Sequence, residues 1–62
     1  MFDEHTLVVL KCPLPSLGLM PGDVGVVVHT YENGAAYEVE FISSDGNTIG
    51  VATVEAADLG QS

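Results

Sequence analysis

Two Asx-Gly pairs, each placed between runs of strand-forming residues, constrain this chain most strongly. Asn33-Gly34 precedes residues 36–43, and Asp45-Gly46 follows them. Asn or Asp followed by Gly tolerates the positive φ angles that a tight β-hairpin turn requires. Residues 37–41 alternate between large apolar side chains and glutamate, which is the period of a strand with one buried face. The sequence therefore predicts two consecutive hairpins, with Glu38 and Glu40 pointing outward.

Two further runs of strand-forming residues precede the hairpins. Residues 6–11 are mostly aliphatic or β-branched and end before two closely spaced prolines, which cannot continue a hydrogen-bonded ladder. Residues 24–31 are rich in valine but contain Gly25, which indicates a bulge or the close approach of another backbone. Together with residues 36–43 and 48–53, these runs predict four strands. The last three residues leave room for no more than the stub of a fifth.

The same alternation predicts the core. In residues 24–31, Val24, Val26 and Val28 share one face, and Gly25, Val27 and His29 share the other. We take the first face as buried and expect His29 to be partly exposed. Nine side chains are expected to form most of the core: Val8, Leu10, Val26, Val28, Tyr37, Val39, Phe41, Val51 and Leu59.

The two segments outside the strands also carry structural information. Residues 12–23 contain three prolines, but their leucines and Met20 are too apolar for a solvated linker, so we expect a loop lying over the core. Within it, Gly22-Asp23 is typical of a turn in which the Asp side chain accepts hydrogen bonds from nearby N–H groups. A catalytic role for Asp23 is the weaker alternative. Residues 55–59 favour a single 3₁₀ turn.

These elements predict an all-β fold, a small SH3-like antiparallel barrel of four to five strands with a C-terminal 3₁₀ turn. Residues 1–62 form a single domain. A ferredoxin-like fold would need two real helices, and no window of this sequence shows three turns of helical periodicity.

Charge restricts the possible partners. The 62 residues include nine acidic residues and one basic residue, Lys11, for a net charge of −8. Surfaces that bind nucleic acid or anionic membranes need several lysines and arginines, so neither is an expected partner. The acidity either keeps a small apolar domain soluble or directs it to a basic protein. The N-terminus lacks the pattern of a signal peptide, so we expect a cytoplasmic protein in which Cys12 stays reduced.

The small size of the domain favours association with another chain. For a chain this short, the free energy gained by apolar burial roughly cancels the entropy lost on ordering. A single cysteine cannot form an internal disulfide, and no cluster of Cys and His offers four metal ligands. We therefore expect a homodimer or larger species, held by the apolar loop 14–20 and the edge strands.

The candidate chemistry is sparse. Glu38 and Glu40 lie two residues apart on one strand, so their carboxylates project from the same face about 7 Å apart. This spacing suits an acid–base pair, but an exposed strand offers nothing to raise a pKa, so we favour a partner-binding face that includes His29. His5 and His29 lack the spacing of metal ligands. We expect no catalysis, no metal and no cofactor.

Two segments carry a resemblance to a known family. Residues 22–29 read G-D-x-G-x-V-V-H, and residues 36–41 read A-Y-x-V-E-F and are followed by Asp45-Gly46. Together they resemble the small bacterial family known as domain of unknown function 4926, over nearly the whole chain. The resemblance implies an intracellular SH3-like module of open function. Small bacterial families of this kind often accompany a larger protein as its antitoxin or immunity partner.

Residues 21–27 are also similar to the opening of KOW motifs in ribosomal and transcription proteins, where a glycine and an acidic residue set the turn into a barrel strand. The basic residues of nucleic-acid-binding KOW domains are missing here. Two hypotheses remain ahead of a KOW-type role. The first is a module that binds a basic protein through Glu38, Glu40 and His29, and the second is a self-associating structural domain.

Overall fold

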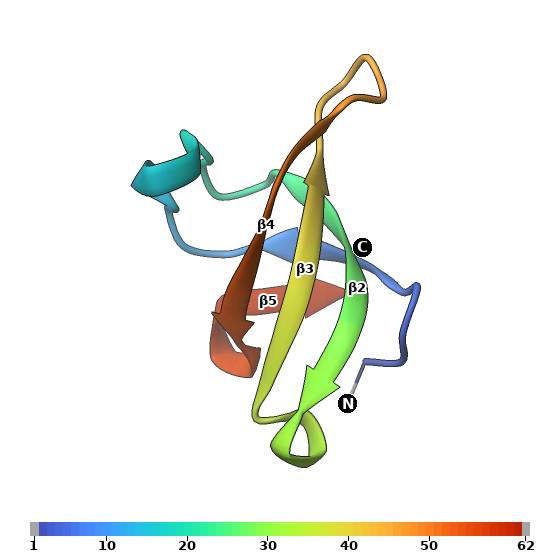
Figure 1. Cartoon of the computed structure of the whole chain (residues 1–62). Coiled ribbons are helices and arrows are strands. Elements are labelled where there is room, and N and C mark those ends of the chain that lie inside the picture. Colours follow the sequence, from blue (N-terminus) through green and yellow to red (C-terminus); the bar gives the residue numbers. More distant parts are fainter. Residues whose placement is uncertain (1, 62) are drawn as a thin grey trace.

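The computed structural model describes residues 2–61 as one antiparallel sheet of five strands. The strands follow the order β4-β3-β2-β1-β5 across the sheet (Figure 1). No helix within these residues is long and apolar enough to cross a membrane. The strands are β1 (Leu7–Leu10), β2 (Val24–Tyr31), β3 (Ala36–Ile42), β4 (Thr48–Glu55) and β5 (Leu59–Gln61), joined in part by the 3₁₀ turns η1 (Pro15–Leu17), η2 (Glu32–Gly34) and η3 (Ala56–Asp58).

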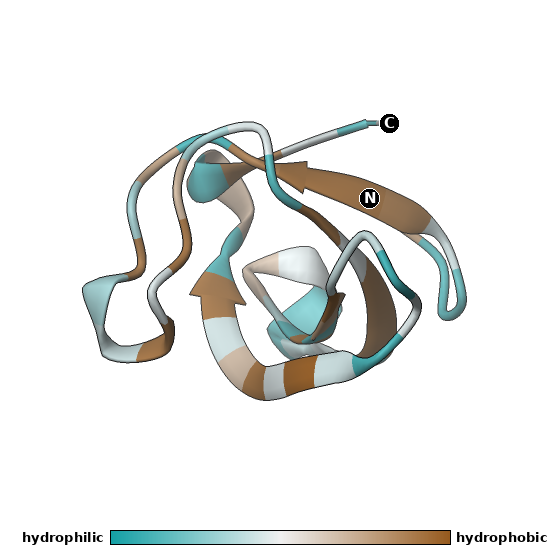
Figure 2. Ribbon diagram, turned by 90° about the horizontal axis from the view of Figure 1, so that it is seen from above, coloured by the Kyte–Doolittle hydropathy of each residue, from teal (hydrophilic) through white to brown (hydrophobic). Residues whose placement is uncertain are grey.

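The all-β prediction is confirmed, including the C-terminal 3₁₀ turn and the short fifth strand. The prediction of a closed barrel is wrong, because β4 and β5 are the two edges of an open sheet. η3 turns the chain away from β4 directly after Glu55, and all three residues of β5 pair with β1 at the far edge. Seen from above, the sheet curls strongly; bands of different hydropathy alternate along one of its strands, whereas another strand is hydrophobic along its whole length (Figure 2).

Both hairpins form where the Asx-Gly pairs predict them. Asn33 and Gly34 adopt φ angles of 58° and 96°, and Gly46 adopts 88°. The backbone N–H of Ser43 donates to the carbonyl of Asn47 at 2.8 Å, closing the second turn. β3 ends one residue earlier than expected, and β4 runs two residues further. The predicted strand boundaries are therefore correct to within two residues.

The core lies on the concave side of the sheet. Its buried side chains are Val8, Leu10, Leu19, Val27, Tyr37, Val39, Phe41, Val54 and Leu59. Three of the nine expected core residues are absent from this set. Val26 is half-buried, whereas Val28 and Val51 are exposed.

The buried face of β2 is the opposite of the expected one, because pairing with β3 decides which side chains of β2 point inward. β3 turns Val39 and Phe41 inward, and these residues pair with Val27 and Gly25 of β2. The inward face of β2 therefore carries Gly25 and Val27. A run of valines contains no polar residue that marks its exposed side, so alternation alone did not separate the two faces.

The expected core position in β4 is wrong for the same reason. Val54 lies opposite the buried Tyr37, so it shares the inward face of the sheet. Val51 lies opposite Glu40 and shares the outward face. The pairing with β3 therefore places Val54 in the core instead of Val51.

Gly25 marks a close approach of two strands, as the sequence predicts. A Cβ atom at this position would lie 2.5 Å from Cγ1 of Val39 and 3.0 Å from the carbonyl oxygen of Glu40. The irregularity in the β2–β3 pairing lies elsewhere, between Val27 and His29. The expectation that His29 shares a face with Val27 is therefore wrong, because the register shift places His29 opposite Glu38. Glycine at position 25 thus allows β2 and β3 to pack at this distance.

The loop between β1 and β2 covers one end of the core. Leu19 is buried, and Leu14 and Leu17 pack against the core cluster. The prediction that this loop lies over the core is confirmed for the three leucines. Met20 is an exception, because its side chain remains 64% exposed.

Candidate functional site

The convex side of the sheet, turned away from the core, is the candidate site, and we call it the outer face. Two cross-strand rows form it: Leu7, Val26, Glu40 and Val51 in one, and His29, Glu38 and Thr53 in the other. All seven side chains are at least partly exposed. The strand pairing thus brings together the three residues that the sequence singles out for binding, His29, Glu38 and Glu40.

Neighbouring side chains hold the carboxylate of Glu38. The hydroxyl of Thr53 on β4 donates to its Oε1 at 2.6 Å, and the hydroxyl of Tyr31 on β2 donates to the same oxygen at 3.5 Å. The His29 ring packs edge-on against Tyr31, with ring centroids 4.6 Å apart. Glu38 is therefore fixed from both flanking strands.

Glu40 is held from β4 as well. The hydroxyl of Thr48 donates to its Oε2 at 3.1 Å. On either side Glu40 pairs with Val26 and with Val51, which is 49% exposed. The outer face therefore combines an anchored carboxylate with exposed apolar surface.

The residues that anchor the two glutamates, Tyr31, Thr48 and Thr53, were missed by the sequence reasoning. A signal for one of them exists, because the register of a hairpin follows from its turn. Counting back from a two-residue Asp45-Gly46 turn places Thr53 opposite Glu38. The observed turn pairs Ser43 with Asn47 instead, and the irregularity between Phe41 and Ile42 restores the pairing of Thr53 with Glu38.

No basic side chain balances these carboxylates within the described part of the chain. Lys11 is the one basic residue of the sequence. It follows β1, and its Cε would lie 3.2 Å from a Cβ atom on Gly60 of β5, so it packs over the opposite edge of the sheet from β4. The outer face is therefore negatively charged.

Metal-binding geometry does not occur within residues 2–61, where no three His, Cys, Asp or Glu side chains gather as ligands would. His5 and His29 make different contacts, one through its backbone and the other through its ring. The backbone N–H of His5 donates to the carbonyl of Val27 at 2.6 Å, whereas the His29 ring packs on Tyr31.

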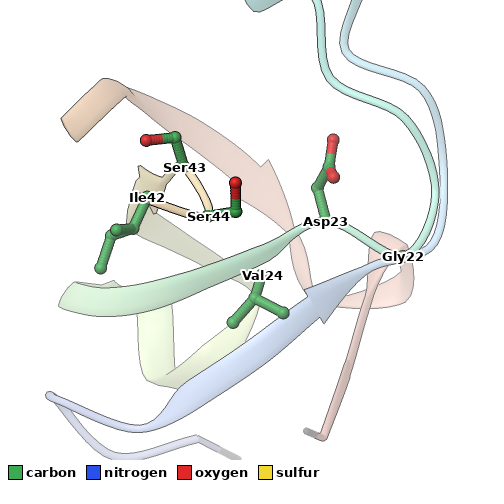
Figure 3. A pocket seen from close by; sticks show the side chains of 6 residues that line it. All are labelled: Gly22, Asp23, Val24, Ile42, Ser43 and Ser44. Carbon is green, nitrogen blue, oxygen red and sulfur yellow. The ribbon is translucent and has the colours of Figure 1, made fainter. Parts of the chain in front are cut away.

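A hollow of about 370 Å³ lies where β2 begins and β3 ends (Figure 3). Its lining residues are Gly22, Asp23, Val24, Ile42, Ser43 and Ser44. The Asp23 carboxylate accepts a hydrogen bond from the backbone N–H of Met20 at 2.8 Å, and the Ser43 hydroxyl bonds with the Asp45 carboxylate. Asp23 and Ser43 thus stabilise their own turns, and the hollow is a weaker candidate than the outer face.

Two turn residues have shifted acidities. The Ser43 hydroxyl, with the Asn47 backbone N–H, holds the pKa of the Asp45 carboxyl below its ordinary value. The Cys12 thiol donates to Oδ1 of Asp58 at 3.2 Å, and this hydrogen bond raises the thiol pKa. A raised pKa leaves less of the reactive thiolate, so Cys12 is a poor nucleophile.

The family described as Domain of unknown function (DUF4926) matches residues 4–61. The chain belongs to this family. The matched segment contains all five strands and every outer-face residue, so the outer face is part of the DUF4926 domain itself. No curated protein and no solved structure matches the chain. The description of DUF4926 leaves its function open, and the function is therefore argued from the site.

Proposed function

We propose that this DUF4926 protein is an acidic protein–protein interaction module that binds a larger, basic protein through its outer face. One observation carries the proposal: an uncovered sheet face combines exposed apolar side chains, such as Leu7 and Val51, with the anchored carboxylates of Glu38 and Glu40. Apolar surface beside fixed charges is suited to a specific protein contact. An antitoxin or immunity protein that binds its cognate partner is one form of such a module.

The charge of the chain supports a basic partner. A net charge of −8 attracts a positive surface over distance and accelerates its encounter with the protein. The same charge repels phosphate backbones, which weighs against a KOW-type role in nucleic-acid binding.

The strand order and the 3₁₀ turn before β5 support an open variant of the SH3-like arrangement.

A binding role accounts for the site better than catalysis does. No charged side chain is buried within residues 2–61. Acid–base catalysis by a carboxylate needs surroundings that tune its pKa, usually by excluding water. Glu38 and Glu40 are partly exposed and therefore suited to salt-sensitive contact with another protein, so we propose a non-enzymatic role without a cofactor.

Reversing both outer-face charges should slow binding. In the variant Glu38→Lys with Glu40→Lys, the association rate with a basic partner purified from extracts of the native cells should fall by at least about tenfold, because steering is lost. The wild-type rate should itself drop steeply as salt rises past about 0.15 M, where the screening length is about 8 Å. Stopped-flow or surface-based kinetics at two salt concentrations measure both effects.

Asp3→Lys with Glu4→Lys is the matched control, since each double variant changes the net charge from −8 by four units to −4. Both control residues are exposed and precede β1. The control should slow association much less than the outer-face variant. Equal slowing by both variants, or a rate that ignores salt, would show that the outer face is not the binding site.

Self-association is a second candidate function, favoured by exposed apolar side chains. Leu7, Val51 and Met20 are between 49% and 64% exposed. Two chains with a net charge of −8 each repel one another, so a homodimer held by the loop 14–20 and the edge strands should strengthen as salt rises, which is the opposite of binding to a basic partner. Sedimentation at micromolar concentration and two salt levels separates the candidates, and a monomer at both levels excludes self-association.

A further inference from the structure

β4 is an exposed edge strand without the usual protection. It forms one edge of the sheet, and its eight residues, T-I-G-V-A-T-V-E, include neither lysine nor proline. Edge strands of natural proteins are commonly protected from pairing by lysine, proline, a bulge or short length. The one irregularity in its pairing lies at its first residues, opposite Phe41 and Ile42. The rest of β4 is a regular strand of β-branched and small residues.

The register shows which backbone groups of β4 face the free edge. The N–H of Ala56 donates to the carbonyl of Ala35 at 3.0 Å. Hydrogen-bonded and non-hydrogen-bonded pairs alternate along an antiparallel ladder, so Val54 and Ala52 also bond with β3. The backbone groups of the intervening residues, Val51, Thr53 and Glu55, therefore point away from the sheet.

The same three residues place their side chains on the convex side of the sheet. Thr53 and Val51 lie in the two rows of the outer face, opposite Glu38 and Glu40. Neighbouring strands are about 4.8 Å apart, so a lysine or arginine on a strand added beside β4 can reach the carboxylates of Glu55 and Glu38. The free edge and the acidic face thus form one continuous surface.

We propose that β4 accepts an extended segment of the basic partner as a sixth strand, with lysine or arginine at alternate positions along the outer face. The proposal rests on the proposed function and specifies how the partner binds. Backbone hydrogen bonds supply affinity in this mode, and alternate side chains supply specificity. A second copy fits less well, because its β4 carries Glu55 and no basic residue.

Amide hydrogen exchange followed by NMR tests the proposal with a defined probe. The probe is a blocked peptide of alternating lysine and valine, as long as β4, and the control peptide alternates glutamate and valine. With the lysine peptide at about ten times its Kd, exchange at Val51, Thr53 and Glu55 should slow about tenfold. Exchange at Ala52 and Val54, which already bond with β3, should not change. The glutamate peptide should have no effect.

Two variants separate backbone pairing from side-chain contact. Val51→Pro removes an N–H that faces the edge and leaves the bonds to β3 in place, so it should weaken binding of the lysine peptide at least tenfold. Val51→Ala loses the same side-chain contact but keeps the N–H, so it should bind the lysine peptide several times more tightly than Val51→Pro does. If Val51→Pro fails to fold, the alternating exchange pattern of the wild-type protein with the lysine peptide still tests whether the peptide pairs with the backbone of β4.

Several results would overturn strand addition. Uniform or absent protection along β4 when the lysine peptide binds would do so, and so would equal binding of the glutamate peptide. Protection of the edge amides that rises with protein concentration alone would identify a second copy as the occupant. If the lysine peptide does not bind, while capture of a basic protein still depends on Glu38 and Glu40, strand addition is wrong and the proposed function stands. If neither binds, both proposals fail.

Discussion

Phe41→Ala should unfold a large fraction of the molecules at room temperature. Phe41 is completely buried in β3 and is among the largest side chains of the core. Truncating a buried phenylalanine costs about 3–5 kcal/mol, and a chain of this length has a free energy of unfolding of only about 3–9 kcal/mol. Urea unfolding followed by circular dichroism measures the loss.

Val51→Ala is the matched control for Phe41→Ala, because Val51 is half-exposed on the outer face. Its free energy of unfolding should stay within about 0.5 kcal/mol of wild type. A Phe41→Ala protein that unfolds cooperatively at the wild-type urea midpoint would show that the core does not depend on this ring.

Gly25→Ala should have the second largest effect, although it adds one methyl group. The new Cβ would lie 2.5 Å from Cγ1 of Val39 and 3.0 Å from both the Glu40 carbonyl oxygen and Cδ1 of Phe41. The carbonyl cannot rotate away, so β2 and β3 must separate locally. Overpacking of this kind costs about 1–3 kcal/mol, and a lower urea midpoint would report it.

Gly50→Ala tests whether this cost arises from the close approach itself. A Cβ atom at position 50 would meet Cδ2 of Leu17 at 3.0 Å, and this is the movable end of a side chain. We expect Gly50→Ala to cost much less than Gly25→Ala. Similar costs for the two variants would contradict the tight packing of β2 against β3.

The sequence predicted the buried face of β3 correctly and that of β2 wrongly, for one physical reason. In β3, Glu38 and Glu40 mark the exposed side, so the inward positions of Val39 and Phe41 follow directly. β2 has valine on both faces, and its inward side is decided only by pairing with β3. Local alternation identifies a face only where one of the two faces is polar.

The site was predictable only in part. The spacing of Glu38 and Glu40 placed both carboxylates on one outward face, and the alternating burial of β3 shows both residues partly exposed between buried neighbours. The hydrogen bonds from Thr48 and Thr53 required the register of β4, which single-strand patterns do not contain. The open edge was unpredictable because it depends on where η3 directs the last three strand residues. Their composition is compatible with either edge of the sheet.

Hydrogen exchange of the free protein in dilute solution tests the open edge beside the acidic face most directly. The amides of Val51, Thr53 and Glu55 should exchange nearly as fast as those of an unstructured chain, because they point to solvent. The amides of Ala52 and Val54 should exchange far more slowly, because they bond with β3. Slow exchange at all five positions would contradict the open edge and show that β4 is covered in the folded protein.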